Sequence, residues 1–97
     1  MPRVIFAPRA IRDLQRLRGF LRPKSAEAAR RAGEAIRQGV RILGEHPHLG
    51  RMVDDLTEEF REWFIDFGDS GYVVRYRVDE SAVTILAIRH QKEAGHS

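Results

Sequence analysis

The first half of the chain has hydrophobic positions at helical spacing. After Pro8, large apolar residues recur every three or four positions, which places them on one face of a helix: Ile11, Leu14, Leu17 and Leu21. Pro8 suits the first turn of this helix, where a missing N–H costs nothing. Pro23 disfavours helical geometry in the residue before it, so the helix is predicted to end near Arg22.

A second helix is predicted to begin after Ser25, a favourable N-cap residue. Its apolar stripe consists of Ala29, Ala32, Ile36, Val40 and Leu43. Gly44, followed by His46-Pro47, marks its end. The small residues beside the stripe, Ala28, Ala35 and Gly39, predict a close approach to the first helix. The connection through Pro23-Lys24 is short, so the two helices are predicted to form an antiparallel hairpin.

The second half of the chain alternates as strands do. Two turn signals, Gly68-Asp69-Ser70-Gly71 and Asp79-Glu80-Ser81, divide residues 60–95 into three strands. Arg3-Val4-Ile5-Phe6-Ala7 is a further short strand, and residues 47–59 are predicted to be a turn followed by an irregular acidic loop. The predicted fold is α+β, a single domain over residues 1–97: an N-terminal strand, the helical hairpin, then a three-strand antiparallel meander forming one small sheet.

Strict alternation assigns each strand residue to one face of that sheet. In the first long strand, the residues that share a face are Arg61, Trp63, Ile65 and Phe67. In the second strand, Tyr72, Val74, Tyr76 and Val78 oppose Val73, Arg75 and Arg77. In the last strand, Thr84, Leu86, Ile88 and His90 are predicted to oppose Val83, Ile85, Ala87 and Arg89. One face of the sheet is predicted to pack against the helices. The other face is predicted to carry aromatic and cationic groups.

Composition narrows the classes of function. The chain contains no cysteine, which excludes disulfides and thiolate metal sites, and no apolar run approaches the roughly 20 residues of a membrane span. The first residues are too few for a signal peptide, so we expect a cytoplasmic protein with no membrane partner. Residues 1–50 carry 11 cations and 4 carboxylates, a net +7, whereas residues 51–97 carry 6 and 10, a net −4. Basic helices predict an acidic protein or a nucleic acid as partner.

Four arginines lie on three neighbouring predicted strands: Arg61, Arg75, Arg77 and Arg89. Either they converge on an anion, because guanidinium groups do not cluster without one, or they pair with Glu62, Asp66, Asp79 and Glu93. His90 could act as a general base or contact a partner, or it could close the strand end through a backbone hydrogen bond. His46-Pro47-His48 lacks a third ligand, and no nucleophile elbow or phosphate loop is present. The sequence therefore predicts no catalytic residue, no metal site and no cofactor.

Several short motifs, in this order, resemble the RelE/ParE superfamily of bacterial toxins. They are Val4-Ile5-Phe6-Ala7-Pro8, Pro47-His48-Leu49-Gly50-Arg51, Phe60-Arg61-Glu62, Gly71-Tyr72-Val73-Val74-Arg75-Tyr76-Arg77-Val78 and Ile85-Leu86-Ala87-Ile88-Arg89-His90. RelE-like toxins cut messenger RNA on the ribosome, using two arginines and a tyrosine at positions that correspond here to Val73, Gln91 and Ser97. Their absence removes a phosphate clamp and an acid–base tyrosine. The Arg89-His90 ending is instead similar to ParE toxins, which are not themselves enzymes.

The resemblance implies a toxin of a type II toxin–antitoxin module that inhibits DNA gyrase and is neutralised by a ParD-like antitoxin. The alternative is a RelE-like ribosome-dependent mRNA endoribonuclease, with the four arginines and His90 gripping phosphates. A third possibility is a decayed toxin that survives only within a repressor complex. We expect no sequence-specific nucleic-acid binding by this chain alone.

The resemblance also suggests residues for each partner. Candidate target contacts are Trp63, Arg75, Arg77, Arg89, His90 and Lys92. The tail, residues 91–97, is expected to be needed for toxicity but not for antitoxin binding. The antitoxin is expected to lie as a helix in a groove beside the helical hairpin, with an extended stretch in addition. Candidate antitoxin contacts are the groove residues Leu14, Leu17, Phe20 and Leu21 and the rim charges Arg12, Arg16 and Arg18.

Overall fold

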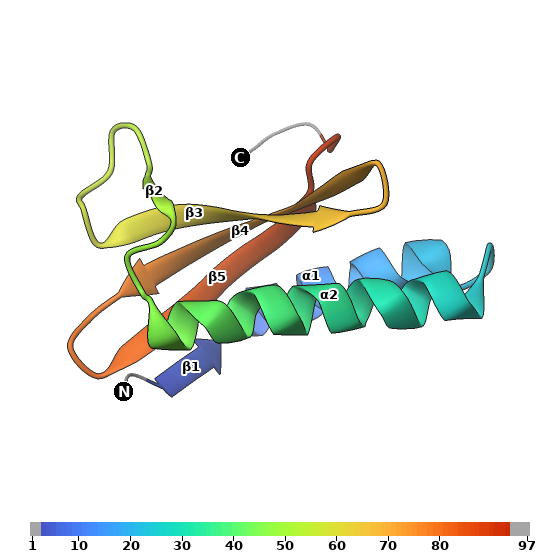
Figure 1. Ribbon diagram of the computed structural model, residues 1–97, viewed down its shortest axis with the longest axis horizontal. Helices are drawn as coiled ribbons and strands as arrows, with labels where there is room; N and C mark the ends of the chain where they lie inside the picture. Colours follow the sequence, from blue (N-terminus) through green and yellow to red (C-terminus); the bar gives the residue numbers. More distant parts are fainter. Residues whose placement is uncertain (1–2, 94–97) are drawn as a thin grey trace.

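Two helices lie on one face of a five-stranded sheet in the computed structural model, which describes residues 3–93 (Figure 1). In chain order the elements are β1 (Arg3–Phe6), α1 (Pro8–Leu21), α2 (Ala26–Glu45), β2 (Arg51–Met52), β3 (Phe60–Phe67), β4 (Ser70–Val78) and β5 (Ala82–His90). The predicted α+β class is confirmed. Neither of the helices in this part of the chain is long and apolar enough to cross a membrane.

Local sequence signals set the ends of the helices. The backbone N–H of Arg22 closes the last turn of α1 by donating to the Arg18 carbonyl at 2.9 Å. The Ser25 hydroxyl accepts a hydrogen bond from the Ala28 N–H at 3.0 Å, which confirms the predicted cap of α2. The prediction for Gly39 was wrong: it lies against β3 rather than α1, because a methyl group built there would come within 2.6 Å of the Ile65 side chain.

The strands are ordered β1-β5-β4-β3-β2 across the sheet. The predicted meander forms through antiparallel pairing of β3 with β4 and of β4 with β5. β1 adds in parallel beside β5, with Arg3 opposite Ala82 and Phe6 opposite Ile85. The prediction that residues 47–59 contain no strand was wrong. Arg51 and Met52 form β2 and pair with Glu62 and Arg61 of β3 at the edge of the sheet opposite β1.

An irregularity in β5 overturns the strict alternation predicted there. Arg75 pairs with Ala87 but its neighbour Tyr76 pairs with Ile85, so Leu86 is an extra residue, a β-bulge. Beyond the bulge the faces exchange. Ile88 and His90 therefore lie on the helix-covered face together with Val83 and Ile85, whereas Ala87 and Arg89 lie on the opposite, free face.

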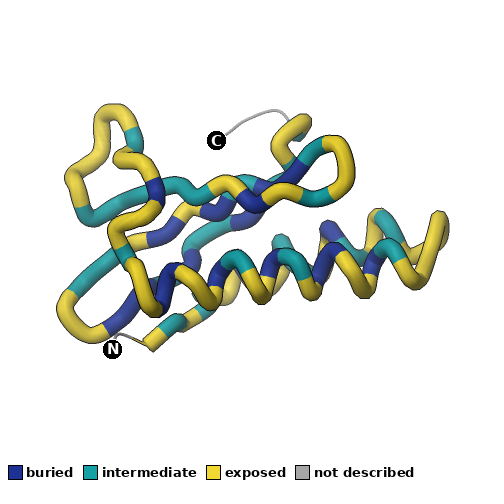
Figure 2. Tube along the Cα trace, in the orientation of Figure 1, coloured by how far each residue is buried: buried dark blue, intermediate teal, exposed yellow. Residues whose placement is uncertain are grey.

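The core lies between the helices and the covered face of the sheet. Its fully buried large side chains are Ile36, Leu43, Val74, Tyr76, Val83, Ile85 and Ile88. Buried positions recur turn by turn along α2 and alternate along β4 (Figure 2). The predicted grouping of Tyr72, Val74 and Tyr76 on one face of the sheet is confirmed, and this is the face that the helices cover. This packing fixes two surfaces, a groove beside α1 and the free face of the sheet.

Candidate functional site

The larger hollow, named here the α1 groove, has a volume of about 710 Å³ and lies between α1, the β3–β4 turn and the end of β5. Its apolar lining comes from Leu17, Leu21, Phe67 and Tyr72, and Phe20 stands at its rim with 66% of its surface exposed. An exposed phenylalanine beside a half-buried apolar lining is a feature of interaction surfaces.

His90 and the turn after it close one end of the α1 groove. The imidazole packs edge-on against Tyr72, with ring centroids 5.5 Å apart. Its Nδ1 accepts a hydrogen bond from the Lys92 N–H at 3.1 Å. The Glu93 carboxylate accepts from the His90 N–H at 2.9 Å. His90 therefore closes the end of its strand through a backbone hydrogen bond, which is one of the two roles predicted for it.

A chain of charges ties this turn to α1. The Arg16 guanidinium pairs with Glu93 and, at 3.6 Å, with Asp13. Asp13 in turn accepts a hydrogen bond from the Ile88 N–H at 2.9 Å. The hydrogen bond to Glu93 is the main cause that raises the pKa of Arg16. Burial opposes ionisation of Glu93, but the hydrogen bonds from Arg16 and the His90 N–H outweigh it and hold the pKa of Glu93 below its ordinary value.

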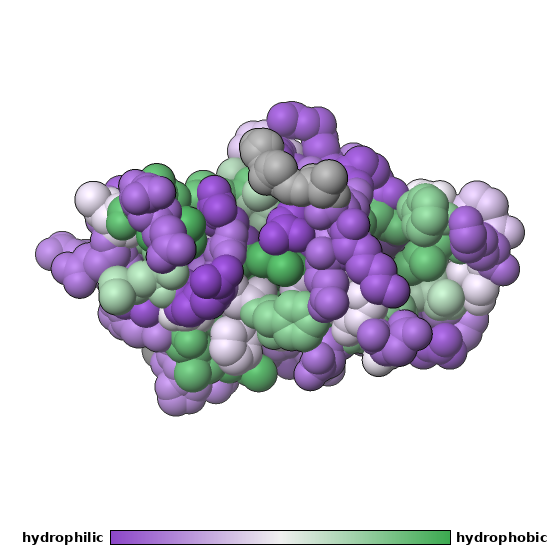
Figure 3. Space-filling view, turned by 90° about the horizontal axis from the view of Figure 1, so that it is seen from above, coloured by the Kyte–Doolittle hydropathy of each residue, from purple (hydrophilic) through white to green (hydrophobic). Residues whose placement is uncertain are grey.

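The free face of the sheet carries paired arginines. Glu62 accepts a hydrogen bond from Arg75 at 2.8 Å and another from Arg51 at 3.1 Å, and Arg77 lies 3.5 Å from Asp79. Arg89 instead reaches backbone carbonyls at the end of its own strand. Viewed from the top of Figure 1, hydrophobic side chains form separate patches among hydrophilic ones (Figure 3).

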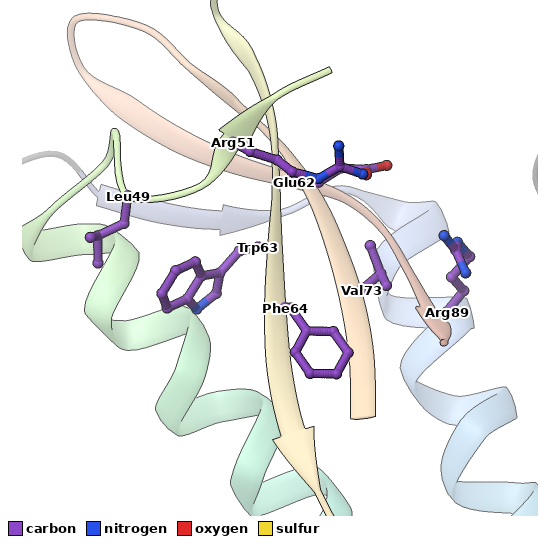
Figure 4. Close-up of a pocket in the computed structure, with 7 residues that line it drawn as sticks. All are labelled: Leu49, Arg51, Glu62, Trp63, Phe64, Val73 and Arg89. Atoms are coloured by element: carbon purple, nitrogen blue, oxygen red, sulfur yellow. The ribbon is translucent and has the colours of Figure 1, made fainter. Parts of the chain in front are cut away.

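A shallow hollow of about 360 Å³ opens beside these arginines (Figure 4). Trp63 and Leu49 lie to one side of β3, and Phe64, Val73 and Arg89 lie to the other. Phe64 is nearly half exposed. The hollow thus combines an aromatic ring with the cation of Arg89 and the Glu62 carboxylate.

The four arginines of the sequence analysis do not converge. Arg61 lies on the covered face, where it donates to the Gly50 carbonyl at 2.9 Å. Arg75 and Arg77 follow the alternative reading and pair with Glu62 and Asp79, whereas Glu93 pairs with Arg16 of α1. Within residues 3–93 no three histidine or carboxylate side chains form a group able to hold a metal ion.

Comparison with known proteins identifies the family. The family model described as "ParE toxin of type II toxin-antitoxin system, parDE" matches residues 4–95. The chain belongs to this ParE family. The resemblance drawn from the motifs is therefore confirmed, and the protein is a toxin of the type II toxin–antitoxin class.

Relatives of this ParE-family chain include toxins of Caulobacter vibrioides. It is 41% identical to Toxin RelE3 over 93 residues, covering 96% of this chain and 98% of that protein. It is 39% identical to Toxin RelE1 over 90 residues, covering 93% and 94%. The structure titled "Chromosomal ParDE TA system from P. aeruginosa" matches with a TM-score of 0.76 over 93% of this chain and 96% of that chain, at 19% identity, a likeness of fold.

The structure divides the target candidates of this ParE chain between two places. Arg75, Arg77 and Arg89 lie on the free face. Trp63 comes from the covered side of β3 and packs partly against the core, but it lines the same hollow as Arg89. His90 and Lys92 instead line the α1 groove. The target candidates therefore do not form one continuous surface.

The antitoxin candidates on α1 also differ in their surroundings. Leu17 is buried, and Leu14 and Leu21 pack partly against the core. Phe20 and Arg16 remain accessible at the groove, and Arg12 is exposed. Arg18 lies against Gly33 of α2, and its Nε is buried without a hydrogen-bond partner in the described part of the chain.

Sequence reasoning missed the other wall of the α1 groove. Phe67 and Tyr72 were assigned only to a face of the sheet, and Glu93 to arginine pairing, because nothing local shows that the β3–β4 turn lies beside α1. The free-face residues Phe64 and Glu62 were missed as well. An alternating strand does reveal them as outward-facing, so this signal was available.

Proposed function

We propose that this ParE-family toxin inhibits DNA gyrase by protein–protein contact and is neutralised by a ParD-like antitoxin. The observation that carries the proposal is the pairing of Arg75 and Arg77 with Glu62 and Asp79 on the free face. The carboxylates beside these arginines repel an RNA backbone brought to the same face. Mixed charges around Phe64 fit a protein surface better.

The α1 groove supports the antitoxin part of the proposal. From α1 to the end of α2 (residues 8–45) the hairpin carries 10 cations and 4 carboxylates, a net +6. An acidic segment with bulky apolar side chains would complement both this charge and the exposed Phe20. Since His90 and Lys92 line the same groove, a bound antitoxin would also mask two of the candidate target contacts.

The second candidate is a RelE-type ribosome-dependent mRNA endoribonuclease. The names of the Caulobacter relatives favour it. The residues at the corresponding catalytic positions, Val73 and Gln91, supply neither a cation nor an acid–base group. The third position, Ser97, lies outside the described residues. The paired arginines of the free face make this candidate the weaker one.

Pulse labelling after induction without antitoxin separates the two candidates. We expect DNA synthesis to fall before protein synthesis, and purified toxin to inhibit supercoiling by gyrase. The double variant R75Q/R77Q is expected to lose most of this inhibition. The matched control R30Q/R37Q removes two exposed, ion-paired arginines from α2 and should keep it. A first fall in protein synthesis together with cleaved transcripts would establish the endoribonuclease instead.

A further inference from the structure

In the α1 groove, Glu93 is already paired with Arg16, the cation that an acidic partner would bind. Arg16 and Glu93 both line this groove, Arg16 from α1 and Glu93 from the turn after β5. Their side chains form a two-pronged pair, one contact being a hydrogen bond of 3.3 Å. The guanidinium of Arg16 thus already has two carboxylate partners in its own chain, Glu93 in the groove and, at 3.6 Å, Asp13 on α1.

The pair can be exchanged at little cost. About half of the Arg16 side chain and over a third of the Glu93 side chain are exposed to solvent. Ion pairs at such exposure contribute little to the stability of a protein. A second carboxylate brought to Arg16 by a bound segment would replace the first without burying an uncompensated charge.

Releasing Glu93 from Arg16 would also affect the turn that follows β5. The same carboxylate accepts the His90 N–H at 2.9 Å, and the Glu93 N–H donates back to the His90 carbonyl at 3.0 Å. These two bonds hold the turn that carries Lys92. Without the carboxylate the His90 N–H loses this acceptor, so the turn becomes easier to open.

We propose that Glu93 is an internal stand-in for an antitoxin carboxylate: a bound antitoxin segment displaces it from Arg16 and thereby loosens the turn at His90–Glu93. The inference rests on the proposed antitoxin partner. The segment that fits places an aromatic or branched apolar side chain against Phe20, Phe67 and Tyr72, with an Asp or Glu next to it for Arg16. Charge complementarity selects this occupant, because α1 carries four arginines against one aspartate, a net +3.

Affinity measurements with a purified ParD-like antitoxin test the exchange. In E93Q the competitor for Arg16 loses its charge, so the antitoxin should bind roughly 2- to 5-fold more tightly, the range that corresponds to a surface ion pair. R16Q should weaken binding, and E93Q should have no further effect in an R16Q background. E34Q is the matched control: it removes an exposed carboxylate paired with Arg37 on α2 and should leave the affinity unchanged.

Hydrogen exchange at the His90 amide gives a second, independent readout on the unmutated protein. If the antitoxin takes over Arg16, exchange at this amide should become faster when the antitoxin is saturating. An antitoxin that docks without displacing Glu93 should instead slow it by covering the site. Slower exchange, or equal affinities for E93Q and the original chain, overturns the inference.

The outcomes also separate this inference from the proposal on which it rests. If the antitoxin does not bind the unmutated toxin at all, the proposed partnership fails. If the antitoxin binds the unmutated toxin and E93Q equally well, or if hydrogen exchange at the His90 amide becomes slower, the partnership stands. Only the displacement of Glu93 from Arg16 then fails.

Discussion

At the scale of a residue, the Tyr76 hydroxyl joins the sheet to the loop after α2. It donates to the Pro47 carbonyl at 2.7 Å and accepts from the Gly50 N–H at 2.8 Å. Burial raises the pKa of Tyr76, so the hydroxyl remains protonated and keeps donating at neutral pH. One side chain thus satisfies two backbone groups of a loop that has little regular structure of its own.

Removing this hydroxyl should destabilise the protein. In Y76F both the Gly50 N–H and the Pro47 carbonyl lose their partner, which typically costs about 1–3 kcal/mol. Urea denaturation measures the loss. Y72F is the control, since the Tyr72 ring is equally buried but its hydroxyl makes no hydrogen bond within residues 3–93. Equal stabilities for Y76F and Y72F would show that the loop is held by other contacts.

At the scale of an element, the β3–β4 hairpin depends on a glycine for its close pairing. Gly71 lies opposite Asp66, and a methyl group built on it would overlap the Ile65 carbonyl oxygen and the Phe64 ring. The backbone of a paired strand cannot shift without breaking its ladder. The turn that forms one wall of the α1 groove therefore rests on this position.

Two alanine substitutions test this reading with opposite signs. G71A should lower the free energy of unfolding by roughly 1–3 kcal/mol through overpacking. G19A, in α1 with nothing within 4 Å of the added methyl group, should raise it by about 0.5–1 kcal/mol because glycine is a poor helix former. Thermal unfolding of both variants gives the comparison. A neutral G71A would mean that β3 and β4 can separate freely.

At the scale of the whole molecule, the α1 groove and the free face each carry an exposed phenylalanine, so the two proposed contacts can be disabled one at a time. Phe20 stands at the α1 groove and Phe64 on the free face of the sheet. Both are well exposed, so replacing either should change stability little. The charges around them also differ, as Arg16 and Lys92 flank the first and Glu62 and Arg89 the second.

F20S and F64S should therefore have opposite phenotypes. F20S should lose roughly 10- to 100-fold in antitoxin affinity, the equivalent of about 1.5–3 kcal/mol for one buried phenylalanine, and should still inhibit gyrase. F64S should inhibit gyrase less and bind the antitoxin normally. Calorimetric titration with the antitoxin and a supercoiling assay measure the two effects. Loss of both activities in one variant would place both partners on one surface.

Part of the candidate site was predictable from the sequence, and the part that was not depends on contacts between distant segments. The resemblance implied Phe20 as a groove residue and Arg16 as a rim charge for the antitoxin, and both do line the groove. The pairing of Arg75 and Arg77 was one of two readings, since sequence gives the spacing of charges along strands but not which carboxylate lies across from them. Arg16 with Glu93 was not predictable, because 77 positions separate them.

By itself, the sequence determined the types of the main elements, their ends and which residues of β3 and β4 share a face, because these follow from periodicity, proline and capping within a few residues. The tertiary structure decided what local signals do not encode: the parallel placement of β1, the short β2, the bulge at Leu86 and the meeting of α1 with the β3–β4 turn. These arise from packing between distant segments. The bulge shows the difference most clearly, since one extra residue moves His90 from the free face to the groove.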